Sequence, residues 1–250
     1  MASSDLSGTT ALVTGASRGF GRGIAAALHH AGADVVAVAR DAEALEQLRA
    51  DLGGSLTTVT ADAADPVVAG SLLERYRPAT LVLNAGAAPL MRPIHHLSWE
   101  AFSRNWDVDV AQAFHWLREA LLLPLAPGST VVTISSGAAL FGSPLSGGYA
   151  GAKAAVRFVT GYAAEESERA GLGIRFVSVL PKLSPATDLG AAAVAAYARR
   201  DGADPVEYAG RLGPALTPDH AGKHVADLVS ATDGPSGAYL LAPEGLKELS

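Results

Sequence analysis

The sequence of 250 residues contains no cysteine. This absence excludes disulfides, catalysis by a thiolate and zinc sites built from cysteine. Charged residues are also scarce at 18%, whereas hydrophobic residues make up 49% and the mean hydropathy is +0.22. A chain with this balance is expected to form a packed core rather than a disordered ensemble.

Basic residues are in the minority, at 19 against 25 acidic residues, which gives a net charge of −6. Nucleic acids and anionic membrane surfaces both attract basic proteins, so we expect neither as a partner. No apolar run reaches the roughly 18 residues that a membrane span requires. The first seven residues are polar and do not resemble a secretory signal. We therefore expect a soluble cytoplasmic protein.

Short apolar runs alternate with longer stretches rich in alanine and leucine. This alternation predicts βαβ units and a parallel sheet, whose buried strands are continuously apolar. No repeat, linker or charge block marks a boundary, so we expect a single domain over residues 1–250. The expected strands are 10–14, 34–39, 55–60, 80–83, 130–135, 174–180 and 238–241, and the expected helices are 20–31, 42–52, 67–76, 98–122, 148–170 and 218–230.

Residues 182–217 interrupt this pattern. They mix proline, glycine, alanine and scattered charge, with one short helix expected at 191–200. A long insertion late in a compact domain is either a functional lid or a disordered loop. Because this segment follows a strand of the sheet, where ligands bind in such folds, we expect a substrate lid.

A glycine-rich turn, Thr14-Gly15-Ala16-Ser17-Arg18-Gly19-Phe20-Gly21, joins the first expected strand to the first expected helix. Glycines permit a tight turn and a close approach of backbone to phosphate, while the helix N-terminus supplies N–H groups and a positive dipole end. The position predicts a dinucleotide site. The Gly-x-x-x-Gly-x-Gly spacing differs from the usual Gly-x-Gly-x-x-Gly, and an ordinary strand-to-helix turn can also contain glycines.

Together with Asn84-Ala85-Gly86 and Tyr149-x-x-x-Lys153, this turn resembles the short-chain dehydrogenase/reductase family in its compact form. The resemblance covers nearly the whole chain. It implies a doubly wound, Rossmann-type parallel sheet of seven strands with helices on both faces, and a nicotinamide cofactor. The residues that the resemblance assigns to cofactor binding are Gly15, Ser17, Arg18, Gly19, Phe20, Gly21, Arg40, Asp62, Asn84, Ala85, Gly86, Tyr149, Lys153, Pro181 and Thr187.

The end of the second expected strand indicates which nicotinamide cofactor is used. A carboxylate there binds the ribose 2′-hydroxyl of NAD, and arginine accommodates the 2′-phosphate of NADP. By resemblance, Ala39 stands where NAD-using members have aspartate, while Arg18 and Arg40 match basic positions of NADP(H)-using members. Guanidinium groups donate paired hydrogen bonds to phosphate. We expect NADP(H) rather than NAD(H). Alternatively, Arg40 is a solvated residue beside a helix-capping Asp41, and Asp62 is an ordinary loop residue.

Tyr149 and Lys153 lie four residues apart on an expected helix and therefore share one face. Isolated tyrosine titrates near pH 10, and a neighbouring ammonium favours the phenolate. Ser136 precedes Tyr149 by 13 residues, as does the serine that orients the carbonyl in the family, whereas Ser135 should point the other way. The resemblance implies that Tyr149 transfers the proton, Ser136 binds the substrate oxygen and Lys153 holds the nicotinamide ribose. Each residue taken singly also fits a purely structural role.

Two positions depart from the family. Its proton-relaying asparagine on the long helix is replaced by Asp109, which could pair with Lys153 and weaken its effect on the tyrosine, or could itself relay protons. A shifted register would bring Asn105 to this position instead. The glycine that commonly follows Pro181 is replaced by Lys182, which could attract an anionic substrate, contact a cofactor phosphate or point into solvent.

The substrate pocket is expected from residues 88–91, 137–145 and the segment after Lys182. These residues either pack in the core or line a pocket suited to a neutral apolar ketone or alcohol. The histidines at 95, 96 and 115 have no accompanying carboxylate cluster, so we expect no metal site. The apolar candidates are Leu90, Met91, Leu140, Phe141, Pro144, Leu145, Leu183 and Leu189.

The sequence thus predicts an NADP(H)-dependent oxidoreductase that reduces an apolar ketone, with Tyr149 as acid and base. One alternative is a 3-oxoacyl-carrier-protein-type reductase, which would need a basic patch for its acidic carrier. The other is a cofactor-sensing binding protein without catalysis, which the departures at Asp109 and Lys182 keep open. The family's assembly implies a homodimer or homotetramer through the helices at 98–122 and 148–170.

Overall fold

The computed structural model describes residues 5–53, 55–231 and 234–249. Its strands form one sheet in the order β3-β2-β1-β4-β5-β6-β7-β8, in which every pairing but the last is parallel. The chain therefore winds outward from β1 in both directions, as predicted. The strands are β1 (Thr10–Thr14), β2 (Asp34–Ala39), β3 (Thr57–Thr60), β4 (Thr80–Leu83), β5 (Thr130–Ile134), β6 (Arg175–Pro181), β7 (Gly237–Ala242) and β8 (Gly245–Leu249).

The predicted fold class is confirmed, but the sheet has eight described strands instead of seven. The additional strand, β8, forms an antiparallel hairpin with β7, in which Ala242 pairs with Gly245. A hairpin this tight needs a residue that tolerates positive φ, and Gly245 has a φ of 137°. Because residues 245–249 contain two charged residues, they lack the apolar pattern by which the buried strands were recognised.

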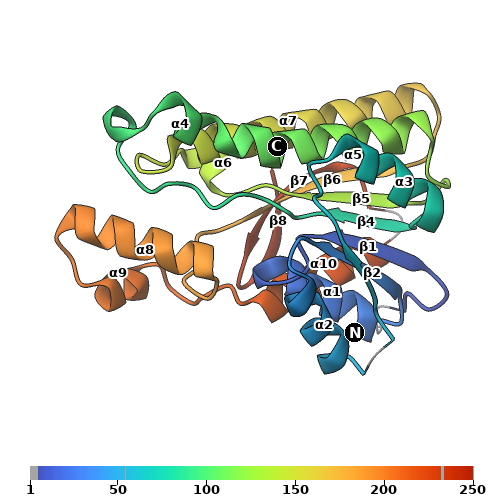
Figure 1. Ribbon diagram of the computed structural model, residues 1–250, viewed down its shortest axis with the longest axis horizontal. Coiled ribbons are helices and arrows are strands. Elements are labelled where there is room, and N and C mark those ends of the chain that lie inside the picture. Colours follow the sequence, from blue (N-terminus) through green and yellow to red (C-terminus); the bar gives the residue numbers. More distant parts are fainter. Residues whose placement is uncertain (1–4, 54, 232–233, 250) are drawn as a thin grey trace.

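Helices cover both faces of the sheet (Figure 1). On one face, α1 (Gly19–His30), α2 (Ala42–Asp51) and α10 (Pro218–Ser230) pack on side chains of the parallel strands. On the other face, α3 (Pro66–Tyr76), α5 (Ala111–Leu122) and α7 (Gly147–Arg169) bury a second apolar cluster. Because helices cover both faces, a ligand can reach the sheet at the ends of its strands.

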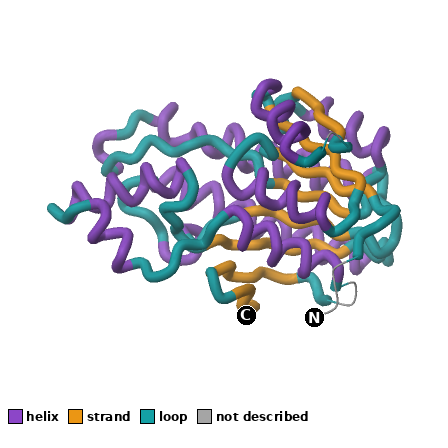
Figure 2. Tube along the Cα trace, turned by 90° about the horizontal axis from the view of Figure 1, so that it is seen from below, coloured by secondary structure: helices purple, strands orange, loops and turns teal. Residues whose placement is uncertain are grey.

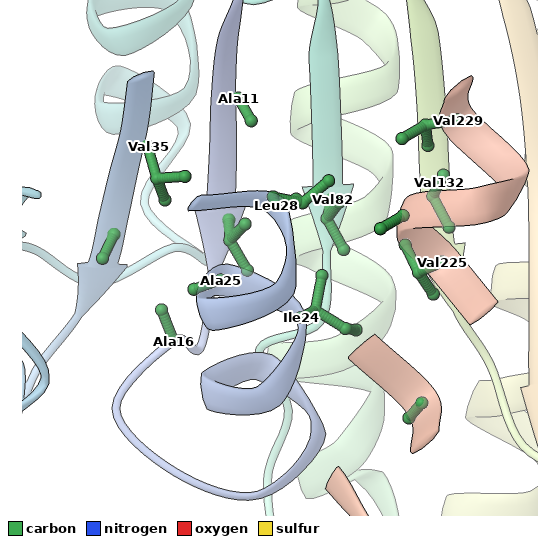
Figure 3. Packing of buried hydrophobic residues seen from close by; sticks show 14 of the residues in the cluster. Ala11, Ala16, Ile24, Ala25, Leu28, Val35, Val82, Val132, Val225 and Val229 are labelled. Atoms are coloured by element: carbon green, nitrogen blue, oxygen red, sulfur yellow. The ribbon is translucent and has the colours of Figure 1, made fainter. Parts of the chain in front are cut away.

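Close contact between α1 and α10 fixes the first layer (Figure 3). A Cβ added to Gly23 would lie 2.1 Å from the backbone oxygen of Pro218, and one added to Gly222 would lie 2.2 Å from the oxygen of Gly23. The two helices therefore touch through backbone, which is possible only where side chains are absent. Their larger apolar residues, among them Ile24 and Val225, are directed at the sheet (Figure 3).

The helix predicted over 98–122 is interrupted. It comprises α4 (Trp99–Asn105), a π-helical turn η2 (Trp106–Val110) and α5. A short 3-10 turn, η1 (Ile94–His96), precedes it. π-Helical turns inside helices are frequent at functional sites because the extra residue redirects side chains. Here, the turn contains Asp109, which is buried.

Beyond the carboxyl ends of the strands the molecule consists of helices and loops (Figures 1 and 2). α6 (Ala138–Phe141) lies on one side, and α8 (Asp188–Asp201) and α9 (Pro205–Arg211) lie on the other. The helix predicted at 191–200 is thus longer than expected, and α9 was not predicted at all. In the part of the chain that the structure describes, none of the helices has the length and apolarity to traverse a lipid bilayer.

Candidate active site

A cleft of about 870 Å³ lies at the carboxyl ends of the strands. Its walls are the segments that directly follow β1, β2, β3, β4, β5 and β6, together with parts of α7, α8 and α9. After the neighbouring strands β1 and β4 the chain continues to opposite sides of the sheet, and doubly wound folds bind ligands at the carboxyl ends of such a strand pair. Of the residues predicted to bind cofactor or to act in catalysis, Gly21 alone is absent from the cleft wall.

The glycine turn is shaped by close backbone contacts. Gly15 has a φ of 64°, and a Cβ there would lie 2.7 Å from Cα of Ala85. A Cβ at Gly21 would lie 2.2 Å from the oxygen of Gly15. The absence of a side chain at residue 21 therefore allows the first turn of α1 to pack against the backbone of Gly15. Arg18 occupies the N-cap of α1 without capping it through its side chain. The first N–H groups of α1 are therefore free of a side-chain cap, as an anion-binding turn requires.

The turn is fastened to the segment after β4 by a buried polar network. The Thr14 hydroxyl accepts hydrogen bonds from the backbone N–H groups of Asn84 (3.0 Å) and Ala85 (3.2 Å), and donates to Oε1 of Gln112 (2.7 Å). The Gln112 amide donates in turn to the oxygen of Ala85 (3.0 Å), and the Asn84 amide donates to the oxygen of Gly15 (3.1 Å). Sequence analysis placed Thr14 in the glycine-turn motif but gave it no role, and it missed Gln112. The available signal was the position of this glutamine, one helical turn after Asp109.

Two arginines line the cleft, one in the glycine turn and one directly after β2. Arg18 and Arg40 both line the cleft, and Ala39 offers no carboxylate there. Arg40 is exposed, and its guanidinium lies 3.9 Å from the Asp62 carboxylate. Asp41 accepts a hydrogen bond from the N–H of Ala44 and so caps α2, as the alternative interpretation supposed. An exposed pair at this distance is weak, so it leaves Arg40 available to an anion.

α7 carries Tyr149 and Lys153 into the cleft. The same helix meets α4 at a glycine, since a Cβ at Gly148 would lie 2.1 Å from the oxygen of Phe102. The helix is thereby held against α4. The Lys153 ammonium lies 5.7 Å from the centre of the Tyr149 ring.

Lys153 is 5% exposed and has two polar partners in the cleft wall. Its ammonium donates to the oxygen of Ile134 (3.0 Å) and lies 3.2 Å from Oδ2 of Asp109. Burial acts to lower the pKa of Lys153, but the Asp109 carboxylate and the nearby Tyr149 outweigh it, so the pKa is raised above its usual value. A charged ammonium next to a half-buried tyrosine is an arrangement that can support proton transfer at the phenolic oxygen.

Asp109, not Asn105, occupies the position beside the lysine. The other oxygen of Asp109 accepts a hydrogen bond from the N–H of Ala87 (2.8 Å). Asn105 donates to the oxygen of Ala87 (2.7 Å) and is not part of the cleft wall. The two side chains together clamp the segment that follows β4.

The two serines at the end of β5 both line the cleft but make different contacts. Ser135 is buried and donates to the oxygen of Lys153 (2.7 Å), which anchors α7 to the strand. Ser136 is half-buried and lines the cleft, and its hydroxyl accepts a hydrogen bond from the N–H of Ala138 (3.1 Å). Because that hydroxyl still carries its own proton, Ser136 can donate to an oxygen atom in the cleft.

The residues after β6 close the cleft from the other side. Pro181 lies against the end of β5, since its oxygen accepts from the N–H of Gly137 (2.8 Å). The Lys182 ammonium lies 3.8 Å from Glu244, which is outside the cleft wall. Thr187 caps α8 by accepting from the N–H of Gly190 (3.1 Å).

The substrate end of the cleft differs in part from the prediction. Met91, Phe141, Pro144, Leu183 and Leu189 line it, whereas Leu90, Leu140 and Leu145 do not. Two tyrosines that sequence reasoning missed, Tyr197 of α8 and Tyr208 of α9, line it as well. Both lie in the segment in which only a short helix was expected.

Residues 9–197 match the model of the short chain dehydrogenase family. Two relatives are "Short chain dehydrogenase/reductase dpmpG" of Macrophomina phaseolina, 36% identical over 54% of this chain and 84% of that protein, and the L-xylulose reductase of Bos taurus, 35% identical over 62% of this chain and 64% of that enzyme. The chain thus matches less than two thirds of the length of this L-xylulose reductase.

Solved structures match over a greater length. A Beutenbergia cavernae protein assigned as an NAD(P)-dependent gluconate 5-dehydrogenase, with bound NADP, is 28% identical with a TM-score of 0.82, covering 96% of this chain and 98% of that one. The 3-ketoacyl-(acyl-carrier-protein) reductase of Brucella melitensis, complexed with NADH, is 25% identical with a TM-score of 0.78, covering 95% and 98%. The family match, the doubly wound sheet and the cleft at its carboxyl edge agree: this chain is an oxidoreductase of the short-chain dehydrogenase/reductase family, whose members bind nicotinamide cofactors and act on small molecules.

Proposed function

We propose that this protein is an NADP(H)-dependent carbonyl reductase in which Tyr149 is the acid and base. The observation that carries the proposal is the buried Lys153 ammonium, which lies next to Tyr149 in the same cleft as the glycine turn. Burial of an ammonium is costly. A role in proton transfer explains why the Lys153 ammonium is nevertheless buried beside a tyrosine that faces the cleft.

The glycine turn fits a dinucleotide, because Gly15 lets the turn lie directly against the backbone of Ala85 and α1 begins without a side-chain cap. We assign the pyrophosphate of the cofactor to this turn and the 2′-phosphate of its adenosine ribose to Arg18 and Arg40. The nicotinamide ribose is assigned to Lys153. When bound, the cofactor supplies the hydride. NADP bound to the Beutenbergia cavernae protein and NADH bound to the Brucella melitensis enzyme are both precedents. The two arginines favour NADP(H) here.

The protein's own residues handle the proton. Tyr149 donates its phenolic proton to the oxygen of the carbonyl as that oxygen gains charge, and Ser136 donates a hydrogen bond to the same atom. The Lys153 ammonium stabilises the phenolate that remains on Tyr149. Asp109 holds Lys153 through their ion pair and is therefore a positioning residue rather than one that touches the substrate.

Two further features belong to this proposal. Residues 182–217 act as a substrate lid, because α8 and α9 contribute to the cleft wall. The chain also forms a homodimer or homotetramer, supported by large apolar side chains exposed on the long helices, among them Phe114 on α5 and Phe158 on α7. Size-exclusion chromatography with light scattering tests the assembly.

The likeness to the Brucella melitensis enzyme favours a second candidate, reduction of a 3-oxoacyl group on a carrier protein. Such a carrier is acidic, and the net charge of −6 opposes its docking. Assays with a 3-oxoacyl thioester of a small thiol and with the same group on a carrier separate the two candidates.

The decisive experiment follows the absorbance of reduced nicotinamide with purified protein, NADPH or NADH, and a panel of ketones. Oxidation of NADPH that is abolished in Tyr149→Phe is the expected result. Cofactor binding without turnover of any ketone or alcohol would overturn the proposal and favour a cofactor-sensing protein. Tyr162→Phe, which changes an exposed tyrosine of the same helix, is the matched control.

A further inference from the structure

Three hydroxyl groups meet at the substrate end of the cleft. Ser143 and Ser146 belong to the loop between α6 and α7, and Tyr197 belongs to α8. All three residues line the cleft. The Tyr197 hydroxyl is hydrogen-bonded to the Ser143 hydroxyl, which is also bonded to the hydroxyl of Ser146. These contacts join the proposed lid to the loop that leads into the catalytic helix.

The direction of these hydrogen bonds follows from counting protons. Ser143 Oγ accepts from the hydroxyl of Ser146 and from the backbone N–H of Ser146 (3.1 Å). A serine hydroxyl has two acceptor positions and one proton to donate. With both acceptor positions used, the bond to Tyr197 must be made with the proton of Ser143. Tyr197 is therefore the acceptor in that bond.

This assignment leaves the phenolic proton of Tyr197 available. Among the described residues, Ser143 is the one hydrogen-bond partner of the Tyr197 hydroxyl. A half-buried O–H in a cleft wall is costly to leave unpaired when a ligand excludes water. The structure therefore presents a fixed donor at the substrate end, held in orientation by Ser143.

We propose that Tyr197 determines substrate specificity by donating this hydrogen bond to a second oxygen of the substrate. The inference rests on the proposed carbonyl reduction and makes its substrate class more specific: a ketone that carries a neutral acceptor, such as a hydroxyl, away from the reacting carbonyl. This differs from the purely apolar ketone that the sequence predicted.

The surroundings of Tyr197 fit a neutral acceptor rather than an anionic one. Its ring stacks on that of Tyr208, with centroids 6.3 Å apart and planes 11° apart, so the hydroxyl is held by aromatic packing. The charged side chain that α8 contributes to the cleft wall is the Asp188 carboxylate, nine positions before Tyr197, so α8 brings no cation to the wall beside the tyrosine. Phe141, two residues before the Ser143 that is bonded to Tyr197, supplies an apolar side chain to the same wall.

The test uses ω-hydroxy-2-alkanones from butanone to hexanone, each paired with the parent 2-alkanone, so that the chain length measures the reach to the second oxygen. We expect the wild-type protein to prefer the hydroxyketone at one chain length. In Tyr197→Phe this preference in kcat/KM should fall by about threefold to tenfold, the value of one neutral hydrogen bond. The parent alkanone, reduced by the same variant, reports that the variant is folded.

The differential readout separates specificity from lid closure, because a loosened lid would slow both ketones of a pair equally. Tyr162→Phe, on the exposed face of α7, should change neither ketone. A wild-type protein that reduces the alkanones without preferring any hydroxyketone, or a preference that survives in Tyr197→Phe, would overturn the inference and leave the reductase intact. Turnover of no ketone at all would overturn both.

Discussion

The carboxylate of Asp109 lies 3.2 Å from the ammonium of Lys153, and both groups are almost fully buried. The family resemblance led us to expect asparagine at this position, so a neutral amide has been replaced by a charge. A negative charge here attracts the ammonium and also opposes a phenolate on Tyr149. The replacement therefore changes the electrostatics of the proposed proton transfer, while Tyr149, Ser136 and Lys153 stay the same as in the family.

Asp109→Asn should shift the pH dependence of alcohol oxidation at its alkaline end. The Asp109 carboxylate raises the pKa of Lys153, so its removal should let the ammonium lose its proton at a lower pH. We expect the alkaline pH at which kcat/KM falls to half its maximum to move down. Initial rates with NADP and an alcohol between pH 6 and 10 measure this shift. Asp107→Asn changes an exposed carboxylate of the same π-helical turn and should leave the profile in place.

The same substitution should weaken the fold at neutral pH. The raised pKa of Lys153 means that, while Asp109 is ionised, the ion pair stabilises the fold at pH values below the ordinary lysine range, and that this contribution is lost as the pH rises through the pKa of the folded state. Because the introduced amide can still accept a hydrogen bond, the loss should be about 2 kcal/mol, less than for a buried charge without any partner. Urea unfolding of both proteins at pH 7 and pH 10 measures it; both values lie below the pKa of folded Lys153, so the loss should be nearly equal, and a loss seen at pH 7 alone would rule out this account.

Arg40→Ala should reduce the preference for NADPH. A guanidinium bound to the 2′-phosphate is charge-assisted, but Arg40 is exposed, so we expect about a tenfold rise in KM for NADPH, at the low end for such contacts. KM for NADH should be nearly unchanged because that cofactor has no phosphate at this place. Steady-state kinetics with both cofactors provide the measurement, and Arg49→Ala on α2 is the control. A parallel rise for both cofactors would mean that Arg40 does not read the phosphate.

Much of the site could be predicted because its residues directly follow buried strands. The apolar runs of β1, β4 and β5 are continuous and easily recognised, and the parallel sheet brings the segments after them to one edge. This placed Gly15, Asn84 and Ser136 in a single cleft. The family resemblance assigned Tyr149 and Lys153, and their spacing of four put both on one face of a helix.

The parts that could not be predicted depend on tertiary contacts or on unusual backbone. The π-helical turn that directs Asp109 at Lys153 has no signature in the residues of 106–110. Gln112 is bonded to Thr14, 98 positions away in the sequence, and Tyr197 to Ser143, 54 positions away. Only the folded chain brings these partners together. By contrast, α9 had a readable start, since Asp204 caps it and Pro205 occupies its first position.

Arg175 should stabilise the fold without affecting the chemistry. It is buried, and its guanidinium donates to the backbone oxygens of Leu228 (2.6 Å) and Ala231 (2.7 Å) at the end of α10. These carbonyls have no partners within the helix, so the arginine replaces a conventional cap. Arg175→Met should reduce the free energy of unfolding by about 2–4 kcal/mol, because charged hydrogen bonds are lost and acceptors stay buried. Arg175→Lys should restore only part of this free energy of unfolding, since an ammonium cannot direct two N–H groups at two carbonyl oxygens as the planar guanidinium does.

Urea denaturation of these two variants, with kcat of the folded protein as a second readout, checks the role of Arg175. An unchanged kcat together with a lower midpoint is the expected pair of results. If Arg175→Met were as stable as the wild type, the carbonyls at the end of α10 would have to be satisfied by water.

The contact between α1 and α10 provides a matched pair of glycine substitutions. Gly222→Ala would place a methyl group 2.2 Å from the backbone oxygen of Gly23, which cannot move without displacing α1 from the sheet. Overpacking of this kind costs about 1–3 kcal/mol, and more where backbone must shift. Gly210→Ala, within α9, meets no atom within 4 Å and should instead stabilise the protein by about 0.5–1 kcal/mol through helix propensity.

Thermal unfolding of Gly222→Ala and Gly210→Ala should therefore move the midpoint in opposite directions for the same chemical change. Because α1 also supplies the N-terminus beside the glycine turn, Gly222→Ala should weaken cofactor binding in addition, although residue 222 is not part of the cleft wall. Titration with NADPH, followed by fluorescence, measures that effect. Full affinity in a destabilised Gly222→Ala protein would mean that the glycine turn holds its shape independently of α10, through Thr14 and Asn84 alone.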